Sequence, residues 1–301
     1  MPPSLVARNL TKTIGDRTIV DSVSFELLPG EVFGFLGPNG AGKTTTIRML
    51  VGLIKPTSGS VEICGHDVRR QFEVAMRCIG CIVENPDLYR FMTGRENLEH
   101  FARMLGVPRS EIDRVADLVG LGHRLGDRVG TYSLGMRQRL GIAQAMLGSP
   151  RVLILDEPTN GLDPAGIREM RGLIRRLASE HQLAIFVSSH LLAEVELTCD
   201  RVAIIHRGRI LRAGTVRELI SSNRMMEFRV GDTARAESIF RERGIDVETA
   251  HDTLLAAIEE ADAPPIIAAL SAGGVELFHA RQRVQTLEDM FLETTGGESV
   301  D

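Results

Sequence analysis

Long apolar runs are missing from this sequence. Within its 301 residues there is no uninterrupted apolar stretch of about 18 residues, the length that a membrane-spanning helix needs. Residues 1–10 also lack the apolar core of a secretory signal. We therefore expect a chain that does not cross a membrane itself, so a role in transport would require a separate chain to form the pore.

Cysteine and lysine are also scarce. There are four cysteines, and Cys78 and Cys81 form a Cys-x-x-Cys pair with no second pair or histidine pair nearby. A disulfide scaffold, a metal site and a redox motif are therefore disfavoured, and we expect buried, reduced thiols in a cytosolic protein. The positive charge is carried almost entirely by arginine, since the only lysines are Lys12, Lys43 and Lys55.

The charge is unevenly distributed along the chain. Residues 222–301 contain seven arginines against sixteen acidic residues, whereas the preceding part is slightly basic. An acidic C-terminal part argues against nucleic acid or anionic lipid as its partner.

Short apolar strands alternate with helical segments over most of the chain. This order predicts an α/β fold with a parallel sheet from strands near 31–36, 79–83, 152–155, 184–187 and 202–205. We expect one domain at 1–221, with a helical subdomain at about 87–148 that includes a helix capped by Ser110. A small α+β domain is expected at 222–301.

Residues 37–44 match the phosphate-binding pattern G-x-x-x-x-G-K-[ST], between a predicted strand and a predicted helix. Glycines let backbone N–H groups approach phosphates closely, and the helix start adds its positive dipole end. Lys43 supplies an ammonium for the β- and γ-phosphates, and Thr44 a ligand for Mg²⁺. The predicted nucleotide-binding residues here are Gly37, Pro38, Asn39, Gly40, Ala41, Gly42, Lys43, Thr44 and Thr45.

Asp156 and Glu157 follow the apolar strand at 152–155. Because successive strand residues point to different sides, the two carboxylates can take different roles. We predict that Asp156 serves the magnesium shell and that Glu157 activates the attacking water. Many strands end in Asp-Glu, but downstream of a phosphate loop the pair indicates an ATPase.

Residues 132–136 (Tyr-Ser-Leu-Gly-Met) open a predicted helix. Taken alone, this segment would be a helix cap; in this position it resembles the signature of the ABC ATPase family, Leu-Ser-Gly-Gly-Gln. Ser133 and Gly135 match that signature, and the other three residues differ. The resemblance implies an antiparallel β subdomain beside a RecA-like core, ATP and Mg²⁺ as cofactors, and binding of Ser133 and Gly135 to ATP held by a second subunit.

Further family elements follow in order. Residues 160–163 (Asn-Gly-Leu-Asp) resemble the loop that crosses the dimer interface, and 188–190 (Ser-Ser-His) resemble the switch segment whose histidine contacts the γ-phosphate. The resemblance extends over roughly residues 5–219. It implies catalytic roles for Lys43, Glu157 and His190.

Two positions depart from the family. Ile14 stands where an aromatic residue usually stacks on adenine, so looser nucleotide selectivity is expected. Glu84 replaces the usual glutamine, and its charge near phosphates is unfavourable unless Mg²⁺ or a proton compensates. The resemblance gives Thr44, Glu84 and Asp156 as metal ligands. The segment 84–86 (Glu-Asn-Pro) is similar to that of bacterial bacitracin- and lantibiotic-resistance exporters.

The function that the resemblance implies is an ATP-hydrolysing transporter subunit. It would power export of a drug, antimicrobial peptide or lipid-like substrate, at the cytoplasmic face of the membrane. Its partners would be a second copy or a homologous ATPase, and a separate polytopic permease. A soluble non-transport ABC ATPase, an importer subunit and a non-catalytic nucleotide sensor remain alternatives.

Overall fold

The computed structural model describes residues 2–84, 86–221, 224–284 and 286–295. The chain divides into two compact units, with the first ending at Thr215 and the second beginning at Val216. This division falls slightly before the expected domain end at Ser221. No helix among the described residues is long and apolar enough to span a membrane.

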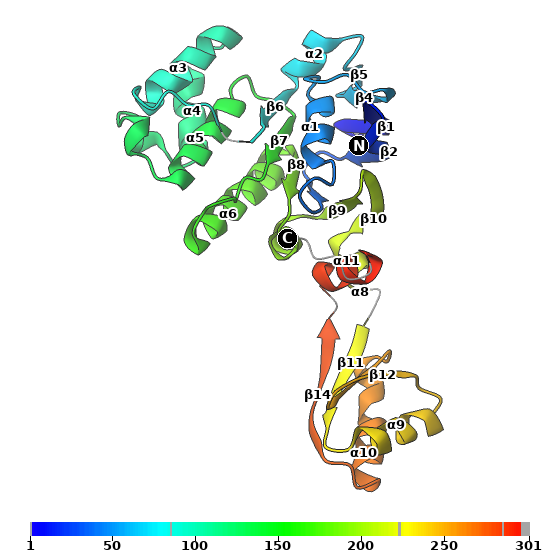
Figure 1. The fold of residues 1–301 in the computed structure, drawn as a ribbon. Helices are drawn as coiled ribbons and strands as arrows, with labels where there is room; N and C mark the ends of the chain where they lie inside the picture. Colours follow the sequence, from blue (N-terminus) through cyan, green and yellow to red (C-terminus); the bar gives the residue numbers. More distant parts are fainter. Residues whose placement is uncertain (1, 85, 222–223, 285, 296–301) are drawn as a thin grey trace. The chain divides into compact units, whose positions relative to one another are not determined.

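An antiparallel sheet forms one layer of the first unit, with strands in the order β2-β1-β4-β5 (Figure 1). Its strands are β1 (Leu5–Ile14), β2 (Arg17–Leu27), β4 (Ser58–Ile63) and β5 (His66–Asp67). The long strands β1 and β2 pair with each other along most of their length, with register shifts near Leu10 and Lys12.

The second layer is a six-stranded sheet in the order β10-β9-β3-β8-β7-β6, parallel except for the β9–β10 hairpin. Its strands are β3 (Val32–Leu36), β6 (Ile79–Ile82), β7 (Val152–Asp156), β8 (Ala184–Ser189), β9 (Arg201–His206) and β10 (Arg209–Thr215). The parallel strands match the expected core.

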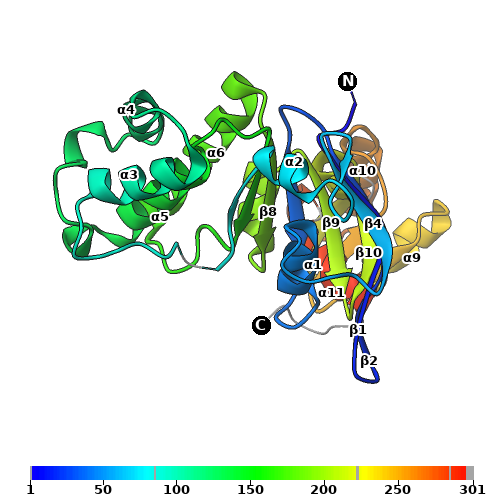
Figure 2. The ribbon, with the colours of Figure 1, turned by 90° about the horizontal axis from the view of Figure 1, so that it is seen from above.

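Helices cover both faces of the parallel sheet. Their bounds are α1 (Lys43–Leu50), α2 (Phe72–Arg77), α6 (Pro164–His181) and α7 (Leu192–Thr198). Figure 2 shows α1 between the two sheets, and its Ile47 and Met49 share one hydrophobic core with Phe33 and Phe35 of β3. On the opposite face of β3, Gly34 leaves room for α7, because a Cβ there would lie 2.6 Å from a methyl of Val195.

The helical subdomain contains α3 (Gly94–Leu105), α4 (Ser110–Leu118) and α5 (Leu134–Ala145), which lie together in Figures 1 and 2. A capping box starts α3, where the Thr93 side chain accepts from the Glu96 N–H and the Glu96 carboxylate accepts in return. The expectation of a Ser110 cap is wrong: α4 begins at Ser110, its N-cap is Arg109, and no side chain caps it.

The second unit contains α8 (Val216–Ser221), β11 (Arg224–Val230), α9 (Thr233–Glu242), β12 (Val247–Ala250), β13 (Thr253–Ala256), α10 (Ala263–Ala272), β14 (Leu277–Val284) and α11 (Leu287–Thr295). From β11 to β14 the order is β-α-β-β-α-β, and the antiparallel sheet reads β12-β13-β11-β14. This is the split βαβ arrangement. Buried Phe228 and Phe240, at 5.1 Å between ring centroids, join the sheet to α9.

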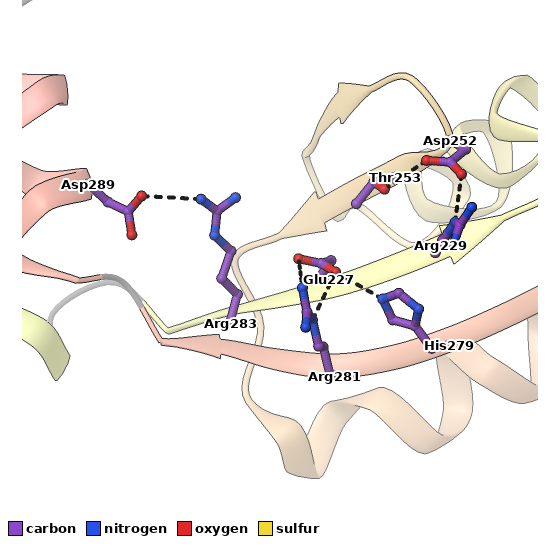
Figure 3. A network of polar contacts seen from close by, with 8 residues as sticks. All are labelled: Glu227, Arg229, Asp252, Thr253, His279, Arg281, Arg283 and Asp289. Atoms are coloured by element: carbon purple, nitrogen blue, oxygen red, sulfur yellow. Dashed lines mark hydrogen bonds and ion pairs between the residues drawn. The ribbon is translucent and has the colours of Figure 1, made fainter. Parts of the chain in front are cut away.

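A polar network joins β11 to β14 in this unit (Figure 3). The carboxylate of buried Glu227 lies 2.9 Å from Nε2 of His279 and accepts from Nε and Nη2 of Arg281. These contacts, with His279 first, hold the pKa of Glu227 below its usual range. The carboxyl is therefore satisfied by partners from the neighbouring strand.

All four cysteines are free thiols. Cys199 is buried, and Cys64 and Cys78 are half-buried. Cys81 is exposed, against expectation, because β6 is an edge strand and α5 packs on its other face, where a Cβ on Gly80 would meet Ala145.

Candidate active site

The phosphate loop joins β3 to α1 in a conformation that requires glycine at several positions. Gly40 has φ 78° and Gly42 has φ 109°, in the left-handed region. A Cβ on Gly37 would lie 2.2 Å from the carbonyl oxygen of Ile205, and one on Gly42 would lie 2.9 Å from that of Ile19. The loop is therefore held tightly by β2 and β9, with the N-terminus of α1 at its end.

A cavity of about 620 Å³ opens over this loop. It gathers most of the predicted phosphate and metal residues, and also Arg17, Ile19 and Asn160. Its lining is Arg17, Ile19, Pro38, Asn39, Gly40, Gly42, Lys43, Thr44, Thr45, Glu84, Asp156, Glu157 and Asn160. Gly37 and Ala41 shape the loop from behind, where Ala41 is buried.

Lys43 is buried, although it carries a charge. Its Nζ donates to the carbonyl oxygens of Gly37, at 2.6 Å, and Pro38, at 3.4 Å. The same Nζ lies 3.4 Å from Oε1 of Glu157. The ammonium is thus fixed between the phosphate loop and the acidic end of β7.

Asp156 is buried at the end of β7, and Ser188 of β8 donates a hydrogen bond to its Oδ1. Burial raises the pKa of Asp156 above its ordinary value, while the Ser188 hydrogen bond and the Lys43 charge oppose that rise. A nearby cation would favour its ionised form, which is the form that binds metal.

Glu157 adopts φ 50°, a left-handed conformation uncommon for glutamate. Its N–H donates to the carbonyl oxygen and the hydroxyl of Ser188, each at 3.2 Å, and these bonds hold the backbone there. Its Oε2 lies 2.8 Å from Nδ1 of His190. The carboxylate is therefore contacted by Lys43 on one oxygen and by His190 on the other.

Glu84 follows β6 with φ 66° and lines the cavity. Its Oε1 accepts from Nη2 of Arg48 on α1 at 2.8 Å. Sequence reasoning considered only Mg²⁺ or a proton as compensation for this charge and missed Arg48. A signal was present, because Arg48 lies four residues after Thr44, on the same helix face.

Ser133 and Gly135 are not among the residues that line this cavity. Ser133 caps α5, with its Oγ accepting from the N–H of Met136 at 3.2 Å, and is exposed. A Cβ on Gly135 would lie 3.7 Å from Leu162, so the start of α5 packs beside residues 160–163 of the same chain. The signature and the phosphate loop of one chain therefore do not form a common cavity among the described residues.

The structure explains Tyr132, which stands where the family signature usually has leucine. The side chain is buried and its hydroxyl donates to the carbonyl oxygen of Arg124 at 2.7 Å. Gly94 makes room for it, since a Cβ at that position would lie 2.5 Å from the hydroxyl. Ile14, the other departure, is 58% exposed and does not line the cavity.

Comparison with known proteins agrees with this geometry. The family model described as ABC transporter matches residues 20–160. The chain is 49% identical to the ABC transporter ATP-binding protein YhcH of Bacillus subtilis over 98% of its length and 97% of the relative's. It is 43% identical to the bacitracin transport ATP-binding protein BcrA of Bacillus licheniformis, over 97% of each chain.

A solved structure is also similar. The cbiO1 protein from Clostridium perfringens, part of the ABC transporter complex cbiONQ, matches with a TM-score of 0.68 and 27% identity over 73% of this chain and 91% of the other. Together with the phosphate loop, the Asp156–Glu157 pair and His190, these similarities identify the fold and the chemistry. The chain therefore belongs to the ABC transporter ATP-binding proteins and is the ATP-hydrolysing subunit of such a transporter.

Proposed function

We propose that two copies of this chain bind two ATP molecules with Mg²⁺ between them, head to tail, and that hydrolysis powers export through a separate membrane permease. The observation that carries this proposal is the separation within one chain of the cavity from the signature. One chain holds the phosphate loop and the proposed catalytic carboxylate in the cavity, whereas the exposed Ser133 and the half-buried Gly135 lie outside it. A second copy can supply them.

Within the site, each residue has a role that follows from its position. The loop 37–45 would cradle the triphosphate with backbone N–H groups, and the Lys43 ammonium would hold the β- and γ-phosphates. Glu157 would accept the proton of the attacking water. His190, hydrogen-bonded to Glu157, would orient that carboxylate and contact the γ-phosphate.

The oxygen atoms in the cavity suit Mg²⁺. Thr44 offers a hydroxyl, and Asp156 and Glu84 offer carboxylates. The described residues contain no group of three His, Cys, Asp or Glu side chains able to hold a metal without other ligands. This fits Mg²⁺, which usually binds one or two carboxylates together with substrate phosphates and water. When bound, it neutralises the charge on the phosphates.

An exposed patch on the helical subdomain suits the permease. We define the Tyr89 patch as Tyr89, Phe91, His100 and Met104. The ring centroid of Tyr89 lies 5.9 Å from that of Phe91 and 5.4 Å from that of His100. Phe91 and Met104 are both about seven-tenths exposed. Tyr89 and Phe91 follow Glu84 closely in the chain, so we expect movement of a docked permease to act on the segment that carries Glu84.

The cargo class is proposed by similarity. The relatives named for bacitracin transport and for lantibiotic transport suggest export of an antimicrobial peptide or similar drug. An importer would be the alternative direction.

Co-purification with a membrane permease tests the proposal. The unmutated chain should co-purify with a polytopic membrane protein and confer resistance to a peptide antibiotic when both are expressed. Phe91→Glu should abolish co-purification and leave the ATPase activity of the isolated chain intact. Leu197→Glu, which changes an equally exposed residue on α7, should have no effect. Co-purification of Phe91→Glu at the unmutated level would contradict the docking site.

A further inference from the structure

The tip of the β1–β2 hairpin places two side chains next to each other. Ile14 and Arg17 are directly opposite in the antiparallel pairing, with only Gly15 and Asp16 between them. Gly15 has φ 57°, as a tight two-residue turn requires. Directly opposite residues of an antiparallel pair project from the same face of the sheet. The position where the family has its aromatic residue is thus adjacent to an arginine.

The part of β2 that carries Arg17 lies beside the phosphate loop. Arg17 and Ile19, on either side of Thr18 in β2, both line the cavity. The carbonyl oxygen of Ile19 lies so close to Gly42 that a Cβ there would be 2.9 Å away. The hairpin tip therefore forms a wall of the same cavity that holds Lys43.

The chemistry of a bound nucleotide predicts which part of the nucleotide contacts the hairpin tip. The γ-phosphate belongs beside Glu157 and the metal ligands, where hydrolysis occurs. The nucleoside is attached at the other end of the triphosphate and must leave the loop away from those carboxylates. Arg17 and Ile19 are the lining residues that come neither from the phosphate loop nor from the segments at 84, 156–157 and 160.

Arg17 is suited to this contact because its guanidinium is uncommitted. Its side chain is exposed and makes no hydrogen bond or ion pair with any residue that the structure describes. A guanidinium is planar and stacks on aromatic rings, whereas the branched aliphatic chain of Ile14 has no π-face.

We propose that Arg17 is the base platform of this site, with its guanidinium stacked face-on against the purine in place of the missing aromatic residue. The inference rests on the proposed ATP site and adds to it the group that holds the base. Face-on stacking uses the π-face that every base has, so ATP and GTP should be held about equally.

Calorimetric titration of the full chain with ATP, GTP and inorganic tripolyphosphate, each with Mg²⁺, tests the proposal. Arg17→Ala should weaken ATP and GTP binding by about two- to fivefold each and leave tripolyphosphate binding unchanged. Arg17→Lys keeps the positive charge but lacks the planar guanidinium, and it should behave like Arg17→Ala. Arg17→Tyr, or Ile14→Tyr added to Arg17→Ala, should recover the lost affinity.

Arg8→Ala is the matched control, since it removes an exposed arginine from β1 of the same sheet, outside the cavity. It should change none of the three affinities. Unchanged ATP binding in Arg17→Ala would overturn the inference alone. An equal loss for tripolyphosphate would also overturn it, because Arg17 would then be a phosphate contact. Failure of the unmutated chain to bind ATP would overturn the proposed function together with this inference.

Discussion

Lys43 and His190 contact different oxygens of Glu157, so two side chains from separate segments converge on one carboxylate. Lys43 has no substitute. The other two lysines lie elsewhere, with Nζ of Lys12 donating to the carbonyl oxygen of Lys55 at 2.8 Å in the antiparallel sheet region. The site residues therefore differ in what their removal should change.

Lys43→Ala should weaken ATP binding strongly and abolish turnover, because no neighbouring ammonium can reach the phosphates. His190→Ala should spare binding and slow hydrolysis by about a hundredfold or more, as expected for a group acting on the charge that develops during reaction. Titration calorimetry and steady-state ATPase rates separate the two effects. Lys55→Ala, a lysine outside the cavity, serves as control, and normal ATPase activity in either site variant would contradict these roles.

Glu84 should make activity depend more strongly on free Mg²⁺ than a glutamine would. Its ion pair with Arg48 is largely exposed, and such pairs compensate charge by only about 0 to 1 kcal/mol, so part of the repulsion toward ATP remains. In ATPase assays over a range of free Mg²⁺, Glu84→Gln should reach its maximum at lower Mg²⁺. Arg48→Gln should require more Mg²⁺ than the unmutated chain. Superimposed curves for all three proteins would show that the charge at position 84 has no such role.

At the scale of helices and strands, periodic sequence patterns predicted the elements that hold the site. The phosphate loop and β7, which is followed by Glu157, lie where hydrophobic spacing and turn residues placed them. The strands β5, β10 and β12 were missed. The strands β5 and β12 have two and four residues, which is too short to show a period, and the edge strand β10 has no buried residue to mark an apolar face.

A contact that depends on tertiary pairing alone was out of reach from the sequence. Arg17 lines the cavity because the β1–β2 hairpin packs beside the phosphate loop, whereas the spacing of Arg48 from Thr44 on α1 did offer a signal. A motif fixes residues that are near in the chain, whereas the place of Arg17 is decided by how the strands and helices pack.

Tyr132 should stabilise the start of α5. In Tyr132→Phe the carbonyl oxygen of Arg124 loses its donor in a buried setting, which should cost about 1 kcal/mol. For a unit of this size the melting temperature should fall by about 2 to 4 °C, measurable by scanning calorimetry. The only other tyrosine, Tyr89, has no hydroxyl hydrogen bond among the described residues, so Tyr89→Phe is a matched control with no expected shift. Equal melting temperatures for both variants would refute this role of Tyr132.

At the scale of the whole molecule, the proposed function depends on a second copy. The cavity over the phosphate loop and the signature residues lie apart in the first unit, and we propose that they are the two halves of ATP sites shared between copies. We also propose that the small split-βαβ unit is an accessory domain without a part in the chemistry. The family's two-site arrangement would use each chain twice, once for its phosphate loop and once for its signature.

The oligomeric state of Glu157→Gln with ATP and Mg²⁺ tests this account most directly. The substitution removes the base but keeps the phosphate cradle, so light scattering should find a stable dimer with bound ATP and the ATPase rate should fall to background. Adding Ser133→Arg, at an exposed position of the monomer, should return the protein to a monomer that still binds ATP. Unchanged turnover in Glu157→Gln, or a dimer that persists with Ser133→Arg, would contradict the account.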